Sequence, residues 1–304
     1  MTDGAAKEGT PASRVERSRL EAHVAELAGE RHPRSSPAAH RNARSYIQEE
    51  FRRAGYFPSL EPFRFRRGTY HNVVARKEGA VSDGAHVLLG AHFDTVRGSP
   101  GADDNASGVA VLLEAARVLA PVPLEATVDF VAFDLEEFQG WTYRVGSRKH
   151  VEAARREGLH YKGAIVLEMV GYTDPRPGGQ KIPRMLRWMG FPDTGDFLAA
   201  IGDGKSASLI SLYREAARSA SPELPIVPFR SPLRGWVVWN TRRSDNASFW
   251  SAGIPALMLT DTAFLRNPNY HKASDLPDTL DPAFMEGVTR ATVEALRRLA
   301  GDAS

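Results

Sequence analysis

Short aliphatic runs alternate with amphipathic segments along most of this chain, and this alternation constrains the fold more than any other feature. Runs rich in β-branched and aliphatic side chains, typical of strands, cover residues 71–79, 85–94, 125–137, 163–171, 224–229 and 254–261. Segments with apolar residues at helical spacing cover residues 12–28, 37–54, 105–120, 146–158, 206–220 and 281–300. Strands that alternate with helices favour a mainly parallel sheet covered on both faces. The sequence therefore predicts one α/β domain in which a central mixed, mostly parallel sheet is sandwiched between helices.

The length and composition are compatible with a single large domain. A chain of 304 residues that is 42% hydrophobic can bury a sizeable core. Residues 1–11 are mostly small and polar, so we expect a disordered N-terminus followed by one domain from 12 to 304. Residues 172–206 are rich in Gly, Pro and Asp, and so long an irregular stretch is typical of a functional lid or insertion.

Charge and residue usage exclude several classes of function. The 39 Lys and Arg residues nearly balance 37 Asp and Glu and are scattered, so no nucleic-acid partner is expected. No run of about 18 apolar residues occurs, so no membrane partner is expected either. The N-terminal sequence lacks the apolar segment of a signal peptide, which predicts a cytoplasmic protein. Because the chain has no cysteine, a metal must be held by His, Asp and Glu.

Acidic and histidine side chains follow the predicted strands at the points where the strands end. The carboxyl ends of neighbouring parallel strands share one crevice, in which ligands bind. We therefore expect convergence of the residues His92, Asp94, Asp104, Glu136, Glu137, Glu168 and His271.

So many buried carboxylates would repel one another and would not stay ionised without positive charge. Two divalent metal ions bridged by one carboxylate, about 3.5–4 Å apart, would neutralise the set and serve hydrolysis. Oxygen and imidazole ligands suit Zn²⁺, with Mn²⁺ or Co²⁺ as possible substitutes. Successive strand residues point opposite ways, so Glu136 and Glu137 can both reach the site only where the strand ends, one as ligand and one as free base.

Six motifs carry a resemblance to a known family. In order and approximate spacing they are similar to those of the co-catalytic zinc aminopeptidases, the M28 peptidases, which are related in fold to glutaminyl cyclases. The resemblance runs from about Tyr70 to the C-terminus, and it is weak over 172–230. The motifs are "HFD", "GADDNASGVAVLLEAAR", "DLEE", "VLEMVG", "SDNASFWSAGIPALMLTDT" and "NYHKASDLPDTLD".

The resemblance implies a site for two zinc ions. Asp104 would bridge the two metals. His92 and Glu168 would complete one metal site, and Glu137 and His271 would complete the other. The neighbouring Asp103 we expect only to complement the dipole of the helix that follows.

The resemblance also implies three residues that act without binding the metals directly. Glu136 would be the general base that takes a proton from the metal-bridged water and passes it to the leaving amine. Asp94 would orient the ring of His92. Tyr270 matches a tyrosine that some members use to polarise the scissile carbonyl.

Three positions depart from the family pattern. Glu168 stands where the family more often has Asp, and Asn246 stands where His is common. The segment "FQGWTYRVGS" replaces a shorter one after Glu137 and brings Phe138, Trp141 and Tyr143 beside the catalytic pair. These departures affect the expected specificity more than the chemistry.

The expected activity is that of a metallo-aminopeptidase, a hydrolase that removes the first residue from peptides with a free N-terminus. A glutaminyl-peptide cyclase with one zinc ion is the nearest alternative of the same fold. A non-catalytic binding module and a carboxypeptidase or dipeptidase are the others, the last requiring a cation such as Arg242 or Arg243 for the substrate carboxylate. Side-chain specificity and oligomeric state stay open.

Overall fold

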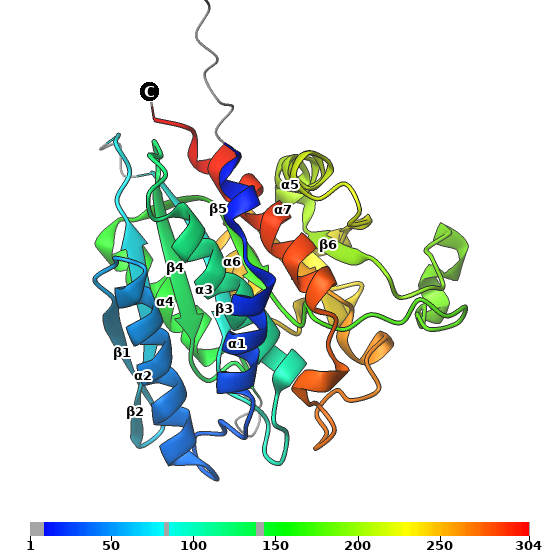
Figure 1. Ribbon diagram of the computed structural model, residues 1–304, viewed down its shortest axis with the longest axis horizontal. Coiled ribbons are helices and arrows are strands. Elements are labelled where there is room, and N and C mark those ends of the chain that lie inside the picture. The colour runs from blue at the N-terminus through cyan, green and yellow to red at the C-terminus, as the bar shows by residue number, and fades with distance from the viewer. Residues whose placement is uncertain (1–8, 82–84, 138–142, 304) are drawn as a thin grey trace, which may run out of the picture.

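A computed structural model describes residues 9–81, 85–137 and 143–303. Its strands form one eight-stranded sheet in the order β1-β2-β4-β3-β5-β8-β6-β7 (Figure 1). The strands are β1 (Ser59–Phe65), β2 (Gly68–Lys77), β3 (Ala85–His92), β4 (Thr127–Phe133), β5 (His160–Leu167), β6 (Leu198–Gly202), β7 (Ile226–Arg230) and β8 (Ala256–Thr260).

The sheet is mixed and mostly parallel, as the sequence predicts. The central strands β4, β3, β5 and β8 are parallel neighbours, and β6 and β7 are parallel to each other. The pairs β1–β2, β2–β4 and β6–β8 are antiparallel. The parallel centre is what places the carboxyl ends of four strands at one edge.

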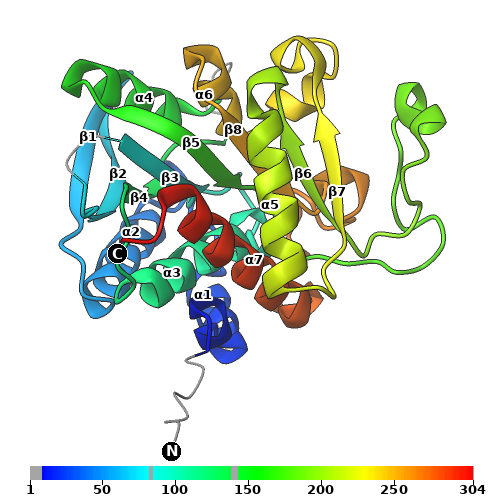
Figure 2. The same ribbon diagram turned by 90° about the horizontal axis from the view of Figure 1, so that it is seen from above.

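Helices cover both faces of the sheet (Figure 2). They are α1 (Arg17–Leu27), α2 (Pro37–Arg53), α3 (Gly108–Leu119), α4 (Val145–Glu157), α5 (Ala207–Ala220), α6 (Asn246–Ala252) and α7 (Pro282–Ala300). One apolar core joins α1, α2, α3, α5 and α7 to the sheet, and a second core joins α4 and α6 to the opposite face. The predicted single α/β domain with a sandwiched sheet is confirmed.

The central strand β3 shows why the sheet must be covered twice. All eight of its residues are buried. Val87 and Leu89 pack in the first core, whereas Leu88 between them packs in the second, as the two-residue period of a strand requires. A side chain of this size stabilises the fold by about 1.5–3 kcal/mol when it is fully buried.

The observed strands differ from the predicted ones in several places. The strand predicted to run to Glu137 ends at Phe133, whereas the strand predicted to end near Glu168 does so, at Leu167. Two strands, β1 and β6, were not predicted, and β6 lies within the stretch 172–206 that was expected to be irregular. The N-terminal prediction falls largely on residues 1–8, which lie outside the described residues.

The remaining irregular segment, 172–197, is anchored at its base. Asp174 and Gly195 exchange two backbone hydrogen bonds of 2.8 and 2.7 Å. The backbone N–H of Gln180 donates to Asp193, and that of Lys181 donates to Leu265, each at 2.8 Å. Beyond these bonds the chain forms an excursion that carries a 3₁₀ helix and stands away from the body of the domain (Figure 2). Whether this excursion acts as a lid stays a prediction.

Candidate active site

The predicted site residues gather at the carboxyl ends of the central strands. His92 is the last residue of β3, and Glu168 directly follows β5. Glu136 and Glu137 lie in the loop after β4, and His271 lies in the loop after β8. Asp104 comes from the turn that precedes α3. Segments far apart in the sequence therefore meet at one edge of the sheet.

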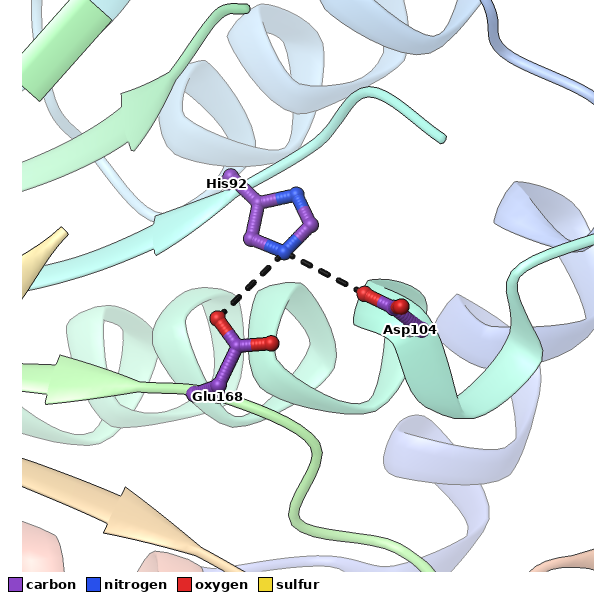
Figure 3. Close-up of side chains that lie close together, drawn as sticks. All are labelled: His92, Asp104 and Glu168. Atoms are coloured by element: carbon purple, nitrogen blue, oxygen red, sulfur yellow. Dashed lines mark ion pairs between the residues drawn. The ribbon is translucent and has the colours of Figure 1, made fainter. Parts of the chain in front are cut away.

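One cluster forms around the ring of His92. Its Nε2 lies 3.3 Å from Oδ1 of Asp104 and 3.5 Å from Oε2 of Glu168 (Figure 3). The same oxygen of Glu168 accepts a hydrogen bond of 2.6 Å from the Oγ of Ser244. Ser244 fixes the longer arm of this glutamate, a contact that the sequence reading did not anticipate.

A second cluster forms around the ring of His271. Its Nε2 lies 3.1 Å from Oδ2 of Asp104 and 3.4 Å from Oε1 of Glu137. Asp104 thus directs one carboxylate oxygen to each histidine. Each of the two clusters is a group of three side chains that could hold a metal ion.

Asp94 holds the loop after β4 through hydrogen bonds to its backbone. Its Oδ1 accepts a hydrogen bond of 2.9 Å from the N–H of Glu136, and its Oδ2 accepts one of 3.2 Å from the N–H of Glu137. Leu135, with a φ of 56°, turns the chain just before this pair. The carboxylate of Asp94 lies 3.7 Å from Nδ1 of His92, whereas the backbone oxygen of Asp94 lies 3.2 Å from it.

Asp104 is held by residues that are distant in sequence. The carboxylate of Asp275 accepts hydrogen bonds from the N–H groups of Asp103 and Asp104, at 2.9 and 3.1 Å. The buried carboxylate of Asp103 accepts hydrogen bonds from the Gly171 N–H and the Asn267 side chain. The expectation that Asp103 only complements a helix dipole is wrong, because it ties three loops together. In the sequence, the role of Asp275 is indicated only by its place in the motif that contains His271.

The electrostatics of the site fit divalent cations. Nε2 of His92, Oδ1 of Asp104 and Oε1 of Glu136 are buried and have no hydrogen-bond partner. Burial, together with the charge of Asp104, raises the pKa of Glu137 to about 7. Burial and the charges of Glu168 and Glu137 raise the pKa of Glu136 well above its usual range, against the opposing charge of His92. Oxygen and imidazole donors in this arrangement suit zinc and similar divalent ions.

Tyr270 lies against the second cluster. Its ring stacks on that of His271, with centroids 3.7 Å apart, and Nη2 of Arg243 lies 3.4 Å from its hydroxyl oxygen. Burial and the neighbouring carboxylates Asp104 and Glu137 raise the pKa of Tyr270. At neutral pH the residue is therefore a protonated phenol that can donate a hydrogen bond.

A cavity of about 560 Å³ opens beside the two clusters. Glu136, Glu137 and Glu168 line it on the side of the clusters, and Tyr143 and Arg243 are also on its wall. Its remaining wall is largely apolar and includes Ile182, Phe191, Phe197, Ile201, Phe229 and Met258. The excursion after Lys181 thus contributes to the same cavity as the clusters.

The positions that depart from the family pattern have different surroundings. Phe138 and Trp141 lie outside the described residues, whereas Tyr143 is on the cavity wall. Asn246 is buried, and its side chain donates to the backbone oxygen of Thr241 at 2.9 Å. Arg242 is likewise buried and bonded to the backbone of a neighbouring loop.

Among the described residues, no helix is both long and apolar enough to cross a bilayer.

Sequence comparison agrees with the geometry of the site. The model of peptidase family M28 matches residues 72–296. The uncharacterized protein YfbL of Escherichia coli (strain K12) is 35% identical over 289 residues, which are 91% of this chain and 86% of that protein. Aminopeptidase YwaD of Bacillus subtilis (strain 168) is 42% identical over 109 residues, which are 35% of this chain and only 23% of that enzyme.

Solved structures show the same fold. An aminopeptidase from Aneurinibacillus sp. strain AM-1 superposes with a TM-score of 0.74 at 17% identity, covering 96% of each chain. A glutaminyl cyclase from Porphyromonas gingivalis superposes with a TM-score of 0.71 at 20% identity, covering 93% of this chain and 98% of that one. Both activities therefore occur on this fold. Because the family model spans most of the sequence, this chain belongs to peptidase family M28.

Proposed function

We propose that this chain is an aminopeptidase that uses two zinc ions to hydrolyse the first peptide bond of a peptide with a free N-terminus. The observation that carries the proposal is the position of Asp104, which directs one oxygen to each of two histidines. A site with one ion would need only one of these clusters. Family membership and the aminopeptidases among the relatives support hydrolysis.

The clustered residues would form two ion sites that share one ligand. Asp104, His92 and Glu168 would hold one ion, and Asp104, Glu137 and His271 would hold the other. When bound, zinc supplies Lewis acidity, which lowers the pKa of a water and polarises a carbonyl oxygen. The protein's own contribution is to fix the ligands, to move protons and to hold the substrate.

Glu136 is the proposed general base. Its carboxylate is buried, its Oε1 has no hydrogen-bond partner, and its backbone is fixed by Asp94. A raised pKa suits a carboxylate that must accept a proton from water and then release it to the leaving amine. Glu136 therefore acts once as a base and once as an acid in each turnover.

Tyr270 and the cavity would bind the substrate. The phenol of Tyr270 can donate a hydrogen bond to the carbonyl oxygen on which negative charge develops during attack. The largely apolar cavity wall accommodates the first side chain, and the surrounding carboxylates attract the free α-amine. Together these features fix the end of the peptide at the site of hydrolysis.

The test of this proposal compares two reactions on one preparation. We expect release of p-nitroaniline from aminoacyl-p-nitroanilides, abolished by a chelator and by Glu136→Gln, and no cyclisation of peptides with N-terminal Gln. Cyclisation without hydrolysis would instead establish the glutaminyl cyclase alternative, which the shared fold allows. Metal binding with neither reaction would contradict both.

A further inference from the structure

Two neighbouring segments at the mouth of the cavity carry exposed tryptophans and an excess of positive charge. The first is 181–192, which contains three basic residues and no Asp or Glu. The second is 224–244, which contains four arginines and no Asp or Glu. The whole chain has a formal net charge of only +2, so the remainder is net acidic. Positive charge is thus concentrated on these two segments, which together we call the cationic rim.

The two segments of the rim lie side by side. Phe191 of the first packs edge-to-face on Phe229 of the second, with centroids 6.0 Å apart. Ile182 and Leu186 line the same cavity as Val238 and Thr241. The two segments of the rim therefore border the same opening.

Large apolar side chains of the rim project into solvent. Trp188 is 82% exposed, Leu233 is 75% exposed, and Trp236 and Trp239 are 62% and 54% exposed. None of these four lines the cavity. An exposed apolar cluster of this kind marks an interaction site rather than ordinary surface.

Contacts within the second segment fix the positions of its exposed side chains. Leu233 and Arg234 have φ values of 47° and 54°, and these left-handed residues form a tight turn at the tip. The guanidinium of the buried Arg242 stacks over Trp236 at 4.4 Å, and Trp236 contacts Trp239 with centroids 5.3 Å apart. These contacts thus hold the exposed rings of Trp236 and Trp239 in place.

Basic side chains flank the exposed rings. Outside the cavity lining they are Arg184, Arg230 and Arg234, and among the described residues these three form no ion pair with an acidic partner. Their charge is available to a negatively charged partner.

We propose that the cationic rim binds the surface of an anionic lipid bilayer. Tryptophan is favoured at the boundary between headgroups and acyl chains, and flanking Arg and Lys are attracted to anionic headgroups. The apolar groups stand on projecting loops, which suits insertion into a lipid surface, whereas a peptide would occupy the concave cavity. Binding of this kind needs no membrane-spanning helix. The missing apolar run, from which no membrane partner was expected, argues only against a spanning segment, so the proposal departs from that expectation.

A second copy of the chain is a poorer partner for the rim. In a two-fold symmetric contact the same patch meets itself. Arginines without acidic partners would then face arginines, and like charges would oppose the contact. An anionic bilayer satisfies both the apolar and the charged parts of the surface.

The test is sedimentation of the full chain with vesicles of phosphatidylcholine alone or mixed with phosphatidylglycerol. We expect binding only to the anionic vesicles, weakened at high salt because the attraction is electrostatic. The combined variant Trp188→Ser, Trp236→Ser and Trp239→Ser should lower the partition coefficient by about tenfold or more, and the Trp→Phe versions should restore part of it. The variant Arg184→Gln with Arg234→Gln should lose the salt-sensitive part.

Matched controls lie on other elements. Phe57 is 97% exposed but follows α2, and Arg155 and Arg156 are exposed on α4. Phe57→Ser and Arg155→Gln with Arg156→Gln should bind vesicles like the parent chain. Peptide hydrolysis in solution should be unchanged in all rim variants named here, which separates this proposal from the proposed function.

Three outcomes would overturn the proposal. They are no binding to anionic vesicles, binding that the rim variants leave unchanged, and rim-dependent binding to polyglutamate or to a second copy of the chain in place of vesicles.

Discussion

Asp104 lies between His92 and His271, with Oδ1 3.3 Å from one imidazole Nε2 and Oδ2 3.1 Å from the other. Each histidine therefore has its own carboxylate oxygen and its own additional glutamate. Asp104→Ala should reduce bound metal to near zero, whereas His92→Ala should retain about one ion per chain, held by Glu137 and His271. Plasma emission on purified variants measures both. Equal loss in the two variants would contradict the assignment of two separable sites.

The neighbouring glutamates Glu136 and Glu137 should behave differently when each is changed to Gln. Glu136→Gln should lower kcat by about 10²–10⁴-fold and keep the metal content, because it removes a proton acceptor and no ligand. Glu137→Gln should lose metal from the His271 cluster, because it removes a ligand. The pair is a matched control, since both residues share the backbone support of Asp94. Loss of metal in Glu136→Gln would show that Glu136 is a ligand.

Asp94 should matter through the loop that it holds. Asn at this position has only one acceptor oxygen and can keep only one of the two backbone hydrogen bonds to Glu136 and Glu137. We expect metal affinity or kcat to fall by about 10–100-fold in Asp94→Asn. Asp129, another buried carboxylate, bonds to Arg76 and His86 instead. Asp129→Asn should change the free energy of unfolding and leave kcat per bound metal unaltered.

Metal affinity should rise with pH. In the metal-free chain burial and the charge of Asp104 raise the pKa of Glu137 to about 7. Burial alone would lower the pKa of His271, but Asp104 and Glu137 outweigh it and raise that pKa to about 10. Both groups hold protons below these values and must release them to bind a cation, so affinity increases as the pH rises. Calorimetric titration from about pH 6 to about pH 8, in buffers of different ionisation enthalpy, measures affinity and proton release. An affinity that is independent of pH would contradict this prediction.

Tyr270 should contribute to the rate without contributing to metal binding. Tyr270→Phe retains the ring that stacks on His271 and removes only the hydroxyl. We expect kcat to fall by about 10²-fold, as for loss of one donor to a developing oxyanion, with KM and metal content little changed. Steady-state kinetics on one aminoacyl substrate and plasma emission on the same preparation provide the comparison. An unchanged kcat would remove Tyr270 from the mechanism.

The parts of the fold that the sequence predicts are those with strong periodicity. The fully buried β3 and the amphipathic α7 are determined by local patterns of apolar residues. Strand β6 could not be predicted in this way, because it has only five residues and follows an irregular segment. Its pairing with β8 and β7 is set by contacts with strands that come later in the chain, and no local pattern reports these contacts.

In the candidate site, too, some features follow from local sequence patterns and others depend on contacts between distant segments. The sequence shows acidic and histidine residues near the ends of predicted strands, and the resemblance to the M28 family implied that Asp104, Glu137 and His271 are ligands before their geometry was known. The groups that hold them, such as Asp275 and Ser244, are polar residues without a distinctive local pattern. Their roles depend on loops that are brought together by the whole sheet.

The measurement that tests the central claim most directly is a zinc titration of metal-free protein in which peptide hydrolysis and bound zinc are followed together. We predict saturation at about two ions per chain, with activity lost in Glu136→Gln at unchanged zinc content. Saturation at one ion per chain with full hydrolytic activity would contradict a mechanism that rests on Asp104 shared between two metals.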